Sequence, residues 1–379
     1  MIRNIYLKNT MVYVISHLFS PINRIIPKHE KYVLIYCSNK GLGDNSGALF
    51  QYLIENHYNN KYQVICGVKQ HKKYQNVALN VKYISRFKAV FEYMRSKYVF
   101  YSNGRIPIKP SYKQMVINMH HGIPIKKIGR LSKIASGDQF FFSYVCASSK
   151  LFVPIMAGAF GCPVDRVLIC GEPKSDNLFK KKKDNRKIIV WAPTFRQSDY
   201  LGYNDSTIKE IIPLFKETDY EELNNVLKEN GVSLIVKPHP SQNIDNRQQK
   251  KYSHFQIVSE KAFSKQGLDL YTFLSQTDAL ISDYSSVYLN YLMLNRPICF
   301  AIPDFEEYQK TRGFVFDNPL DYMPGIHARS KEDVYRFIKD VATGIDYYSD
   351  SRVMVSKLIN KYQDGKNCKR LLEYAGIRI

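Results

Sequence analysis

The chain has 379 residues, which at about 100 to 200 residues per domain predicts two domains and excludes a single small core. Apolar residues make up 45% and charged residues 23%, a globular mixture that excludes wholesale disorder. Lysine and arginine number 55 against 34 aspartates and glutamates, so the net charge of +21 predicts an anionic partner: nucleic acid, a phosphorylated substrate or an acidic membrane surface.

The first segment, residues 1–30, is predicted to be an amphipathic lead-in that does not cross a membrane. No stretch reaches the roughly 20 apolar residues of a spanning helix, and residues 11–19 contain Ser16 and are stopped by Pro21. A small-residue cleavage site is missing, so a secretory signal is not expected. An amphipathic helix over 5–26 either lies in the headgroup region of an anionic membrane or packs on its own domain. Both interpretations stay open.

Beyond residue 30, short apolar strands alternate with helical stretches. Strands are predicted over 32–37, 63–67, 98–101, 115–119, 144–147 and 167–170. Helices are predicted over 47–57, 87–94 and 151–160. Such alternation is typical of a parallel sheet with helices on both faces. We therefore predict a first, Rossmann-like domain over residues 31–184.

A basic break over 180–187 precedes a second alternation of the same kind. Its strands are predicted over 188–191, 233–236, 255–258, 279–282 and 298–301, and its helices over 220–229, 268–275 and 287–294. The mainly helical stretch 331–374 is expected to complete this second domain, residues 185–379. The predicted fold class is α/β, with two doubly wound domains that face each other across a cleft. Ligands of such sheets bind at the carboxyl ends of the strands, so the loops after strands are the candidate sites.

The loop after strand 115–119 carries His120, His121, Gly122 and Lys126. A neutral imidazole at a strand end can accept a proton from an attacking hydroxyl at physiological pH. The glycine permits a tight turn or a close approach of substrate. The alternative is that one histidine caps the strand and the lysine belongs to a solvated face.

The loop after strand 233–236 reads Lys237-Pro238-His239-Pro240. Two prolines stiffen the chain on either side of the imidazole, and the lysine adds a positive charge beside it. A stiffened histidine and a lysine at a strand end suit a leaving phosphate. The alternative is a rigid turn without chemistry.

Asp283-Tyr284-Ser285-Ser286 joins strand 279–282 to the next predicted helix. Hydroxyls and free backbone N–H groups at a helix N-terminus bind phosphate, and the helix dipole assists them. The alternative is simple N-capping by the aspartate or the first serine. The two roles are compatible, because a capping loop leaves other donors pointing outward.

Further polar side chains follow other strands. Thr194 and Arg196 end the first strand of the second domain and offer a hydroxyl and a guanidinium. Residues 171–176 end the first domain and are a candidate hinge. Arg312 follows an acidic loop, and an exposed ion pair is the alternative to a substrate contact there.

No metal site and no disulfide framework is expected. His120 and His121 are adjacent, so on a strand they would point to opposite faces and could not easily share a metal. The sequence has no His-x-x-x-His pair and no carboxylate cluster. Its 7 cysteines contain no Cys-x-x-Cys pair, which favours a reducing cytoplasm.

Taken together, these loops resemble the CDP-glycerol glycerophosphotransferase family, which builds teichoic acids and related capsule polymers in bacteria. The resemblance runs from about residue 115 to 317. The matching segments, in the family's order, are His121-Gly122 with Pro124 and Lys126, Gly171 and Pro173 with Asp176 and Leu178, Ala192 to Arg196, Lys237 to Pro240, Ser282 to Ser286, Arg296-Pro297 and Arg312 to Phe314. The family's tryptophan and threonine around the first histidine are replaced here by His120 and Ile123, and the first 110 residues match no motif.

The resemblance implies a GT-B fold with an acceptor-binding first domain and a nucleotide-binding second domain. It also implies the reaction: an acceptor hydroxyl attacks the β-phosphorus of CDP-glycerol or CDP-ribitol, and CMP leaves. In this hypothesis His121 is the general base, and His239 stabilises or protonates the departing phosphate. The substrate-binding residues would be Gly122, Lys126, Thr194, Arg196, Lys237, Asp283, Ser285, Ser286 and Arg312. No metal or other cofactor is expected, because a cationic cleft can neutralise the phosphoryl charge.

The donor, the product polymer and the inner membrane leaflet are all anionic, which accounts for the net charge of +21. We expect a polyprenyl-linked saccharide or a polymer as acceptor, and a peripheral location on the cytoplasmic face of the bacterial membrane.

The nearest alternative is a GT-B glycosyltransferase that moves a sugar from a nucleotide sugar onto a capsule or surface glycan. A nucleic-acid-binding protein is not favoured, because no helix-turn-helix, zinc or ribonucleoprotein signature is present. A catalytically inactive scaffold conflicts with the two motif-matched histidines. The sequence leaves open glycerol or ribitol, one addition or many, the acceptor, the oligomer and the membrane contact.

Overall fold

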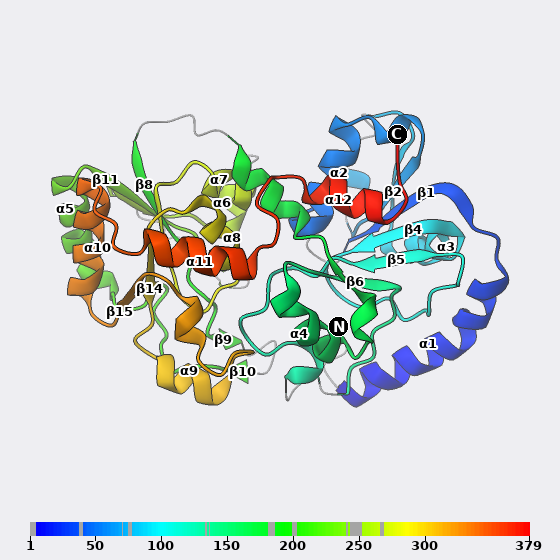
Figure 1. Ribbon diagram of the computed structural model, residues 1–379, viewed down its shortest axis with the longest axis horizontal. Helices are drawn as coiled ribbons and strands as arrows, with labels where there is room; N and C mark the ends of the chain where they lie inside the picture. Colours follow the sequence, from blue (N-terminus) through cyan, green and yellow to red (C-terminus); the bar gives the residue numbers. More distant parts are fainter. Residues whose placement is uncertain are drawn as a thin grey trace. The chain divides into compact units, whose positions relative to one another are not determined.

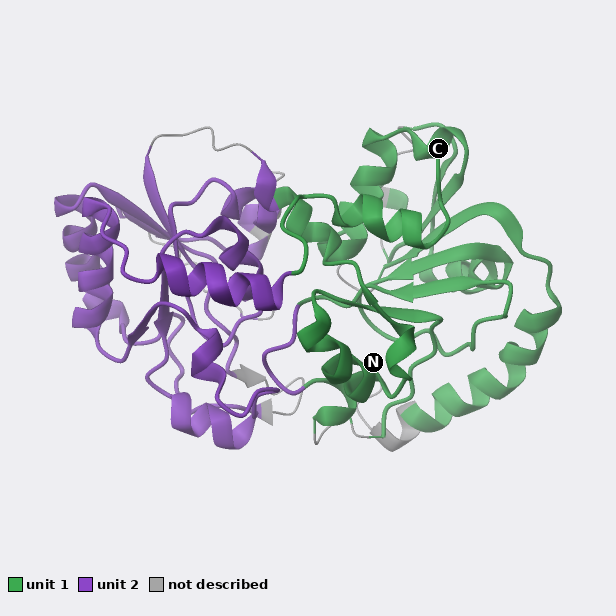
Figure 2. Cartoon of the chain, viewed as in Figure 1, with its two compact units in different colours: residues 1–122, 128–177, 361–379 green, residues 123–127, 178–360 purple. Residues whose placement is uncertain are grey.

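A computed structural model of the chain divides into two compact units, each built around one parallel sheet (Figure 1 and Figure 2). Unit 1 comprises residues 1–122, 128–177 and 361–379, and unit 2 comprises residues 123–127 and 178–360. The structure describes residues 5–37, 41–69, 71–74, 78–132, 135, 137–180, 186–198, 203–239, 242, 252–265 and 269–379. The expected domain boundary at 184/185, the lysines at 181–183 and Pro240 lie outside the described residues.

The sheet of unit 1 has seven parallel strands in the order β3-β2-β1-β4-β5-β6-β7. The strands are β1 (His29–Tyr36), β2 (Gln63–Gly67), β3 (Val81–Ile84), β4 (Ser96–Tyr101), β5 (Met115–Asn118), β6 (Tyr144–Ala147) and β7 (Val167–Ile169). The central strands are near-continuous apolar runs because helices cover both faces of a parallel sheet. The strand order reverses between β1 and β4, which is where open α/β sheets bind ligands.

The α-helices in the described part of unit 1 are α1 (Ile5–Ile25), α2 (Asp44–Glu55), α3 (Arg86–Arg95), α4 (Val153–Phe160) and α12 (Asn367–Tyr374). Ser85 caps the start of α3, since its side chain accepts a hydrogen bond from the Lys88 backbone N–H. Gly161 ends α4 in the left-handed conformation, with φ of 62°.

The C-terminal residues 361–379 lie in unit 1, although the sequence led us to expect that they complete the second domain. Helix α12 packs against α2, and Leu371 belongs to the buried core cluster that includes Val33 of β1. The Asp176 carboxylate accepts the backbone N–H groups of both residues that begin α12, Asn367 and Cys368, at 2.8 Å each. The apolar pattern of this segment predicts an amphipathic helix, but it does not identify the core that the helix covers.

The sheet of unit 2 has six parallel strands in the order β12-β11-β8-β13-β14-β15. They are β8 (Lys187–Trp191), β11 (Val232–Val236), β12 (Phe255–Ile257), β13 (Ala279–Ser282), β14 (Ile298–Ala301) and β15 (Ile326–Ala328). The helices are α5 (Tyr220–Glu229), α6 (Glu260–Lys265), α7 (Leu270–Leu274), α8 (Val287–Tyr291), α9 (Phe305–Thr311), α10 (Lys331–Thr343) and α11 (Ser349–Ile359). A short antiparallel pair, β9 (Gln197–Ser198) and β10 (Tyr203–Asn204), follows β8.

The two parallel sheets confirm the predicted α/β fold class with two doubly wound domains. In unit 2 the strand order reverses between β8 and β13, and β11 lies on the other side of β8. The loops that follow these three adjacent strands therefore emerge at one edge of the sheet. They are the loops that begin at Ala192, Lys237 and Asp283, the sources of three predicted motifs.

Candidate active site

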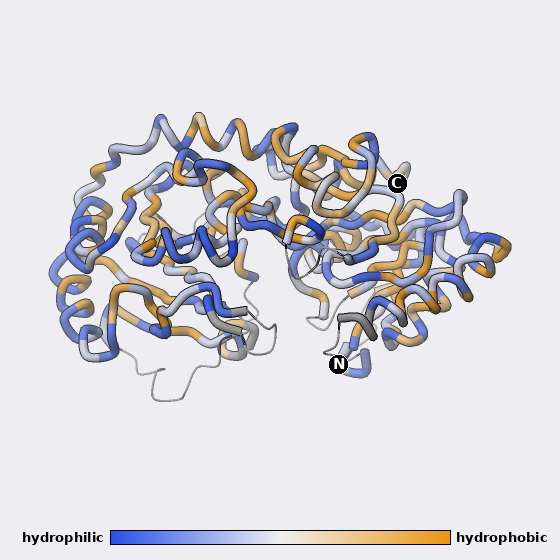
Figure 3. The backbone as a smooth tube through the Cα atoms, turned by 90° about the horizontal axis from the view of Figure 1, so that it is seen from below, coloured by the Kyte–Doolittle hydropathy of each residue, from blue (hydrophilic) through white to orange (hydrophobic). Residues whose placement is uncertain are grey.

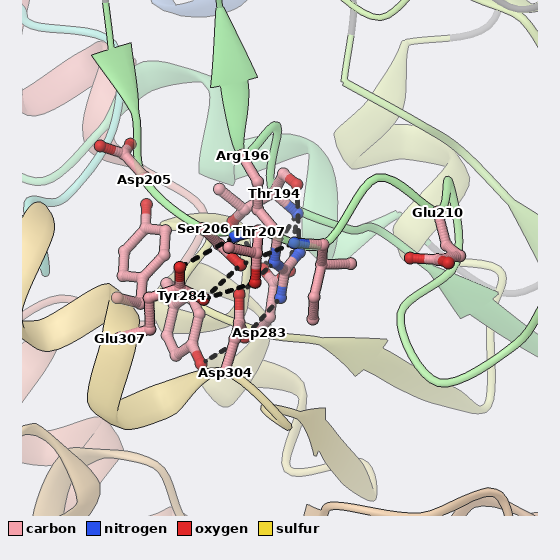
Figure 4. A network of polar contacts seen from close by, with 12 residues as sticks. Thr194, Arg196, Asp205, Ser206, Thr207, Glu210, Asp283, Tyr284, Asp304 and Glu307 are labelled. Atoms are coloured by element: carbon pink, nitrogen blue, oxygen red, sulfur yellow. Dashed lines mark hydrogen bonds and ion pairs between the residues drawn. The ribbon is translucent and has the colours of Figure 1, made fainter.

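Asp283 joins two predicted loops of unit 2 (Figure 4). Its carboxylate is fully buried and accepts the backbone N–H of Thr194 at 2.8 Å and the hydroxyl of the same residue at 2.5 Å. Nη1 of Arg196 donates to the same carboxylate at 2.7 Å. Asp283 therefore does not act as the N-cap of the next helix, which was one of the expected roles. Its carboxylate instead holds the loop after β8 against the loop after β13.

Arg196 is buried, and its guanidinium binds two carboxylates. Besides Asp283, it contacts Asp304 through Nε at 2.7 Å and through Nη2 at 3.2 Å. The hydroxyl of Tyr284 donates to Asp304 at 2.9 Å. Burial opposes ionisation of Asp304, but the hydrogen bonds and charge of Arg196 outweigh it and hold the pKa of this carboxyl below its usual value. These contacts favour a positioning role for Arg196 over the direct substrate contact expected from the sequence.

Lys126 lies in unit 2, although the histidines that precede it lie in unit 1. An isolated antiparallel bridge pairs it with Phe314, and the Val315 N–H donates to the Ile125 carbonyl at 2.9 Å. Burial lowers the pKa of the Lys126 amine to about 8; nearby Asp283 opposes this shift and Arg312 adds to it. Two of the predicted cationic groups, Lys126 and Arg312, are therefore near enough for one charge to affect the other, and the carboxylates of Asp283 and Asp205 act on the same amine.

His239 stands at the end of β11, partly buried, with its ring stacked on that of Phe195 at a centroid distance of 5.8 Å. The Lys237 ammonium instead forms an ion pair with Glu260 at the start of α6 and lies 5.3 Å from the ring centroid of Phe263. The charge of this lysine is therefore paired within unit 2 with a carboxylate of α6, whereas the sequence had led us to expect it beside the leaving phosphate.

Ser285 and Ser286 are half-buried between the end of β13 and the start of α8. Ser286 makes no side-chain cap hydrogen bond, and the Oγ of Ser285 is 3.5 Å from the Val287 N–H, too long for a strong cap. Helix α8 has five residues and continues as a 3-10 turn over Leu292–Leu294. The two hydroxyls thus lie at the sheet edge where a phosphate was predicted to bind, and neither makes a strong hydrogen bond that caps the helix.

In unit 1, the predicted base lies on the loop after β5. His121 is exposed, whereas His120 is buried and its Nδ1 is 2.7 Å from the Gly122 carbonyl oxygen. Burial lowers the pKa of His120, which favours the neutral form of this ring. Because β5 ends at Asn118 and His120 has φ of 56°, the two rings lie 4.4 Å apart between centroids. The expectation that they point to opposite faces is wrong, since the chain has left the strand before it reaches them.

Although the rings of His120 and His121 are close together, they do not form a metal centre with other described side chains. Among the residues that the structure describes, no group of three or more histidine, cysteine, aspartate or glutamate side chains is arranged to hold a metal ion.

From the sequence, Lys174 was considered only as part of the candidate hinge 171–176. Its contact with the loop that carries His121 was missed. Lys174 is buried, and its Nζ donates to the backbone oxygen of His121 at 2.7 Å. The available signal was its position after β7, because loops after parallel strands share one edge of the sheet.

A family model described as CDP-Glycerol:Poly(glycerophosphate) glycerophosphotransferase matches residues 18–375 of the chain. The chain is 33% identical over 257 residues to a teichoic acid glycerol-phosphate primase of Bacillus subtilis (strain 168), covering 65% of this chain and 60% of the primase. It is 25% identical to a teichoic acid glycerol-phosphate transferase of Staphylococcus aureus (strain NCTC 8325 / PS 47), covering 97% of this chain and 99% of that protein. A teichoic acid ribitol-phosphate polymerase of the same S. aureus strain, TarK, is 26% identical, covering 79% of this chain and 60% of its own.

Among solved structures, the wall teichoic acid polymerase TagF superposes with a TM-score of 0.72 at 19% identity, covering 92% of this chain and 89% of that chain. This likeness is one of fold, and it agrees with the two-domain GT-B arrangement predicted from the sequence.

Proposed function

The chain belongs to the CDP-glycerol:poly(glycerophosphate) glycerophosphotransferase family, and from this premise we propose that it transfers an alditol phosphate from a CDP-alditol to an acceptor hydroxyl. The alditol is glycerol or ribitol, and CMP is the second product. The observation that carries this proposal is the family match over residues 18–375, which includes each predicted loop. A nucleotide-sugar glycosyltransferase, the alternative left open by the sequence, is not favoured by this match.

We assign the CDP-alditol to the carboxyl edge of the unit 2 sheet. Lys126 and Arg312 provide positive charge for its diphosphate, and Ser285 and Ser286 provide hydroxyl donors. Thr194, Arg196 and Asp283 hold the surrounding loops in place through the hydrogen bonds of the buried cluster. Binding donors that are fixed before the reaction need little reorganisation in the transition state.

The chemical step follows from the two histidines. In our proposal, the acceptor hydroxyl transfers its proton to the His121 imidazole while its oxygen bonds to the β-phosphorus. The bond between the β-phosphorus and the bridging oxygen breaks, and CMP departs with the electron pair. His239 stabilises or protonates the phosphate of that leaving group, and Phe195 stacked on its ring restricts the ring's orientation.

Helix α1 supports a membrane-surface location. Its buried side chains are polar, Ser16, Ser20 and Asn23, and Asn23 donates to the Gln114 side chain at 2.7 Å. Apolar and polar residues alternate along the helix (Figure 3). Among its exposed apolar residues, five recur every three or four positions: Met11, Val14, Leu18, Ile22 and Ile25. Val12, Ile15 and Phe19 of the same helix are half-buried, so α1 packs on its own unit through polar and apolar side chains and leaves the stripe of exposed apolar residues uncovered.

An uncovered apolar stripe is typical of a helix that lies in the membrane interface. In the described part of the chain, no helix combines the length and the apolar character that crossing a bilayer requires. We propose a peripheral location at the cytoplasmic face of the membrane, where the acceptor is a polyprenyl-linked saccharide or a growing polymer. The net charge of +21 favours attraction to anionic lipid.

A donor panel tests the proposed function. The full chain is incubated with a synthetic lipid-linked acceptor and, separately, CDP-glycerol, CDP-ribitol, a UDP-sugar or a CMP-sugar. We expect acceptor-dependent CMP release with one of the two CDP-alditols and a product heavier by whole alditol-phosphate units in mass spectrometry. Turnover of a nucleotide sugar alone would overturn the proposal.

A further inference from the structure

We propose that Lys174 is a positioning residue for His121: its buried ammonium anchors the backbone of the loop that carries this histidine. The inference rests on the proposed function, in which His121 is the general base. It concerns a residue of unit 1 that touches no reacting atom in that mechanism.

The anchor is a direct charge-assisted hydrogen bond. Nζ of Lys174 is 2.7 Å from the backbone oxygen of His121, and it lies 2.8 Å from Oδ1 of Asp44 and 3.7 Å from Oε1 of Glu172. The lysine and the glutamate side chains are about 95% buried. Hydrogen bonds with an ionised donor are shorter and about twice as strong as neutral ones. The carbonyl of His121 therefore accepts from a strong donor.

A second contact fixes the residue before it. Nδ2 of the buried Asn45 donates to the backbone oxygen of His120 at 2.8 Å, and its Oδ1 accepts the Lys174 N–H at 3.1 Å. The same Nδ2 lies 3.3 Å from Oε1 of Glu172. Two successive carbonyl groups of the loop are thus bound by one cluster, which the chain assembles from the starts of α2 and of the loop after β7.

The energetics favour a positioning role. A buried ammonium is costly unless it is paired, so its two carboxylate neighbours are needed to keep it charged. His121 is exposed, but Met119, His120 and Gly122 around it are buried, and its backbone oxygen is bound by the Lys174 ammonium. The cluster therefore fixes the direction in which the chain leaves β5 and hence the point from which the exposed imidazole extends.

The consequence for catalysis is a dependence on geometry. A displacement of a catalytic group by about 1 Å can cost on the order of 100-fold in rate. Removing the ammonium frees the carbonyl of His121 and leaves Asp44 and Glu172 without it, so the loop is expected to adopt several positions. The binding of the CDP-alditol in unit 2 does not involve this cluster.

The test compares Lys174→Met, Lys174→Arg and Lys97→Met. Lys97 is the matched control, a lysine of the same unit that pairs with Glu30 and belongs to neither site. Relative to wild type, and per folded protein, we expect Lys174→Met to lower kcat with CDP-glycerol or CDP-ribitol, whichever donor the wild type uses, by about 10- to 100-fold, with KM for the donor within about twofold. Lys174→Arg should recover most of kcat, and Lys97→Met should match wild type.

Amide hydrogen exchange gives a readout that does not need turnover. In Lys174→Met, peptides spanning residues 119–123 should exchange faster, whereas peptides from β1 and β4 should exchange as in wild type. An equal kcat in Lys174→Met, or unchanged exchange at 119–123, would overturn the positioning role. Absence of CMP release by the wild type would instead refute the proposed function, and the exchange measurement would still decide on the anchor.

Discussion

The Arg196 guanidinium lies 2.7 Å from the Asp283 carboxylate, and the two side chains are 4% and 0% exposed. The ion pair joins the loop after β8 to the loop after β13, the two strands between which the sheet order reverses. It therefore fixes the shape of the place at which such sheets bind their ligands. Asp304 extends the pair into a buried network of one cation and two carboxylates.

Arg196→Met is expected to destabilise unit 2, because it leaves Asp283 and Asp304 buried without their cation. Breaking such a pair from one side typically costs about 3–5 kcal/mol in the free energy of unfolding. The control is Arg329→Met, since Arg329 and Glu306 form a pair whose side chains are 50% and 63% exposed. Exposed pairs contribute at most about 1 kcal/mol. Urea unfolding measures both variants, and similar losses in the two would contradict the structural role of Arg196.

Lys126 predicts a pH dependence of donor use. Its pKa of about 8 means that the amine loses its charge as the pH rises through that value. If this charge binds the diphosphate, kcat/KM for the CDP-alditol that the wild type uses should fall above about pH 8. Lys126→Arg should move the fall to higher pH, because a guanidinium stays protonated. The exposed neighbour provides the control, Lys127→Arg, which should keep the wild-type profile. A wild-type profile that is flat between pH 7 and pH 10 would remove Lys126 from donor binding.

The Lys126 amine also makes the free energy of unfolding depend on pH. This free energy should rise with pH over the range in which kcat/KM falls. Its pKa is about 8 in the folded chain against 10.5 for an ordinary lysine, so the unfolded chain binds the extra proton between these values. Stability rises with pH where the unfolded state binds more protons. The contribution of Lys126 to the free energy of unfolding should therefore increase from about pH 8 to 10.5, and Lys126→Met should lack this increase. Denaturation of the two proteins across this range compares them directly, and parallel curves would count against the lowered pKa.

The apolar stripe of α1 should control binding to lipid. Leu18→Glu places a charge at a stripe position that is 60% exposed, and we expect it to reduce flotation with vesicles containing anionic phospholipid. Leu79→Glu makes the same change at a position of unit 1 that is 71% exposed and lies outside the stripe, so it should float as wild type does. Equal flotation of all three proteins would show that α1 is not the contact.

Sequence patterns predicted most of the central strands, and they failed where burial is partial. Strand β13 lies at Ala279–Ser282 as expected, because a fully buried parallel strand is a continuous apolar run. The edge strands β3 and β15 were missed; each is short, includes half-buried positions and lacks such a run. Helix α9 (Phe305–Thr311) was missed as well. Of its seven residues, only one phenylalanine and one tyrosine can pack in a core, and the other five are charged or polar.

The site could be predicted as a set of loops but not as a set of contacts. Because Thr194, Asp283 and His239 each follow a predicted strand, the sequence alone placed them at one edge of the sheet. The partners of the charged groups lie far away in sequence: Asp304 is 108 positions from Arg196, and His121 is 53 positions from Lys174. No local pattern contains such pairings, so the roles of Arg196 and Lys174 required the structure.

The most direct test of the account is the rate of CMP release from CDP-glycerol or CDP-ribitol, whichever donor the wild type uses, by His121→Gln and His239→Gln. Both variants should fold and lose at least about 100-fold in kcat, the contribution expected of a general acid or base. His254→Gln, at the amino end of β12 and therefore away from the carboxyl edge, should retain the wild-type rate. Near-normal turnover by either of the first two variants would contradict the proposed mechanism.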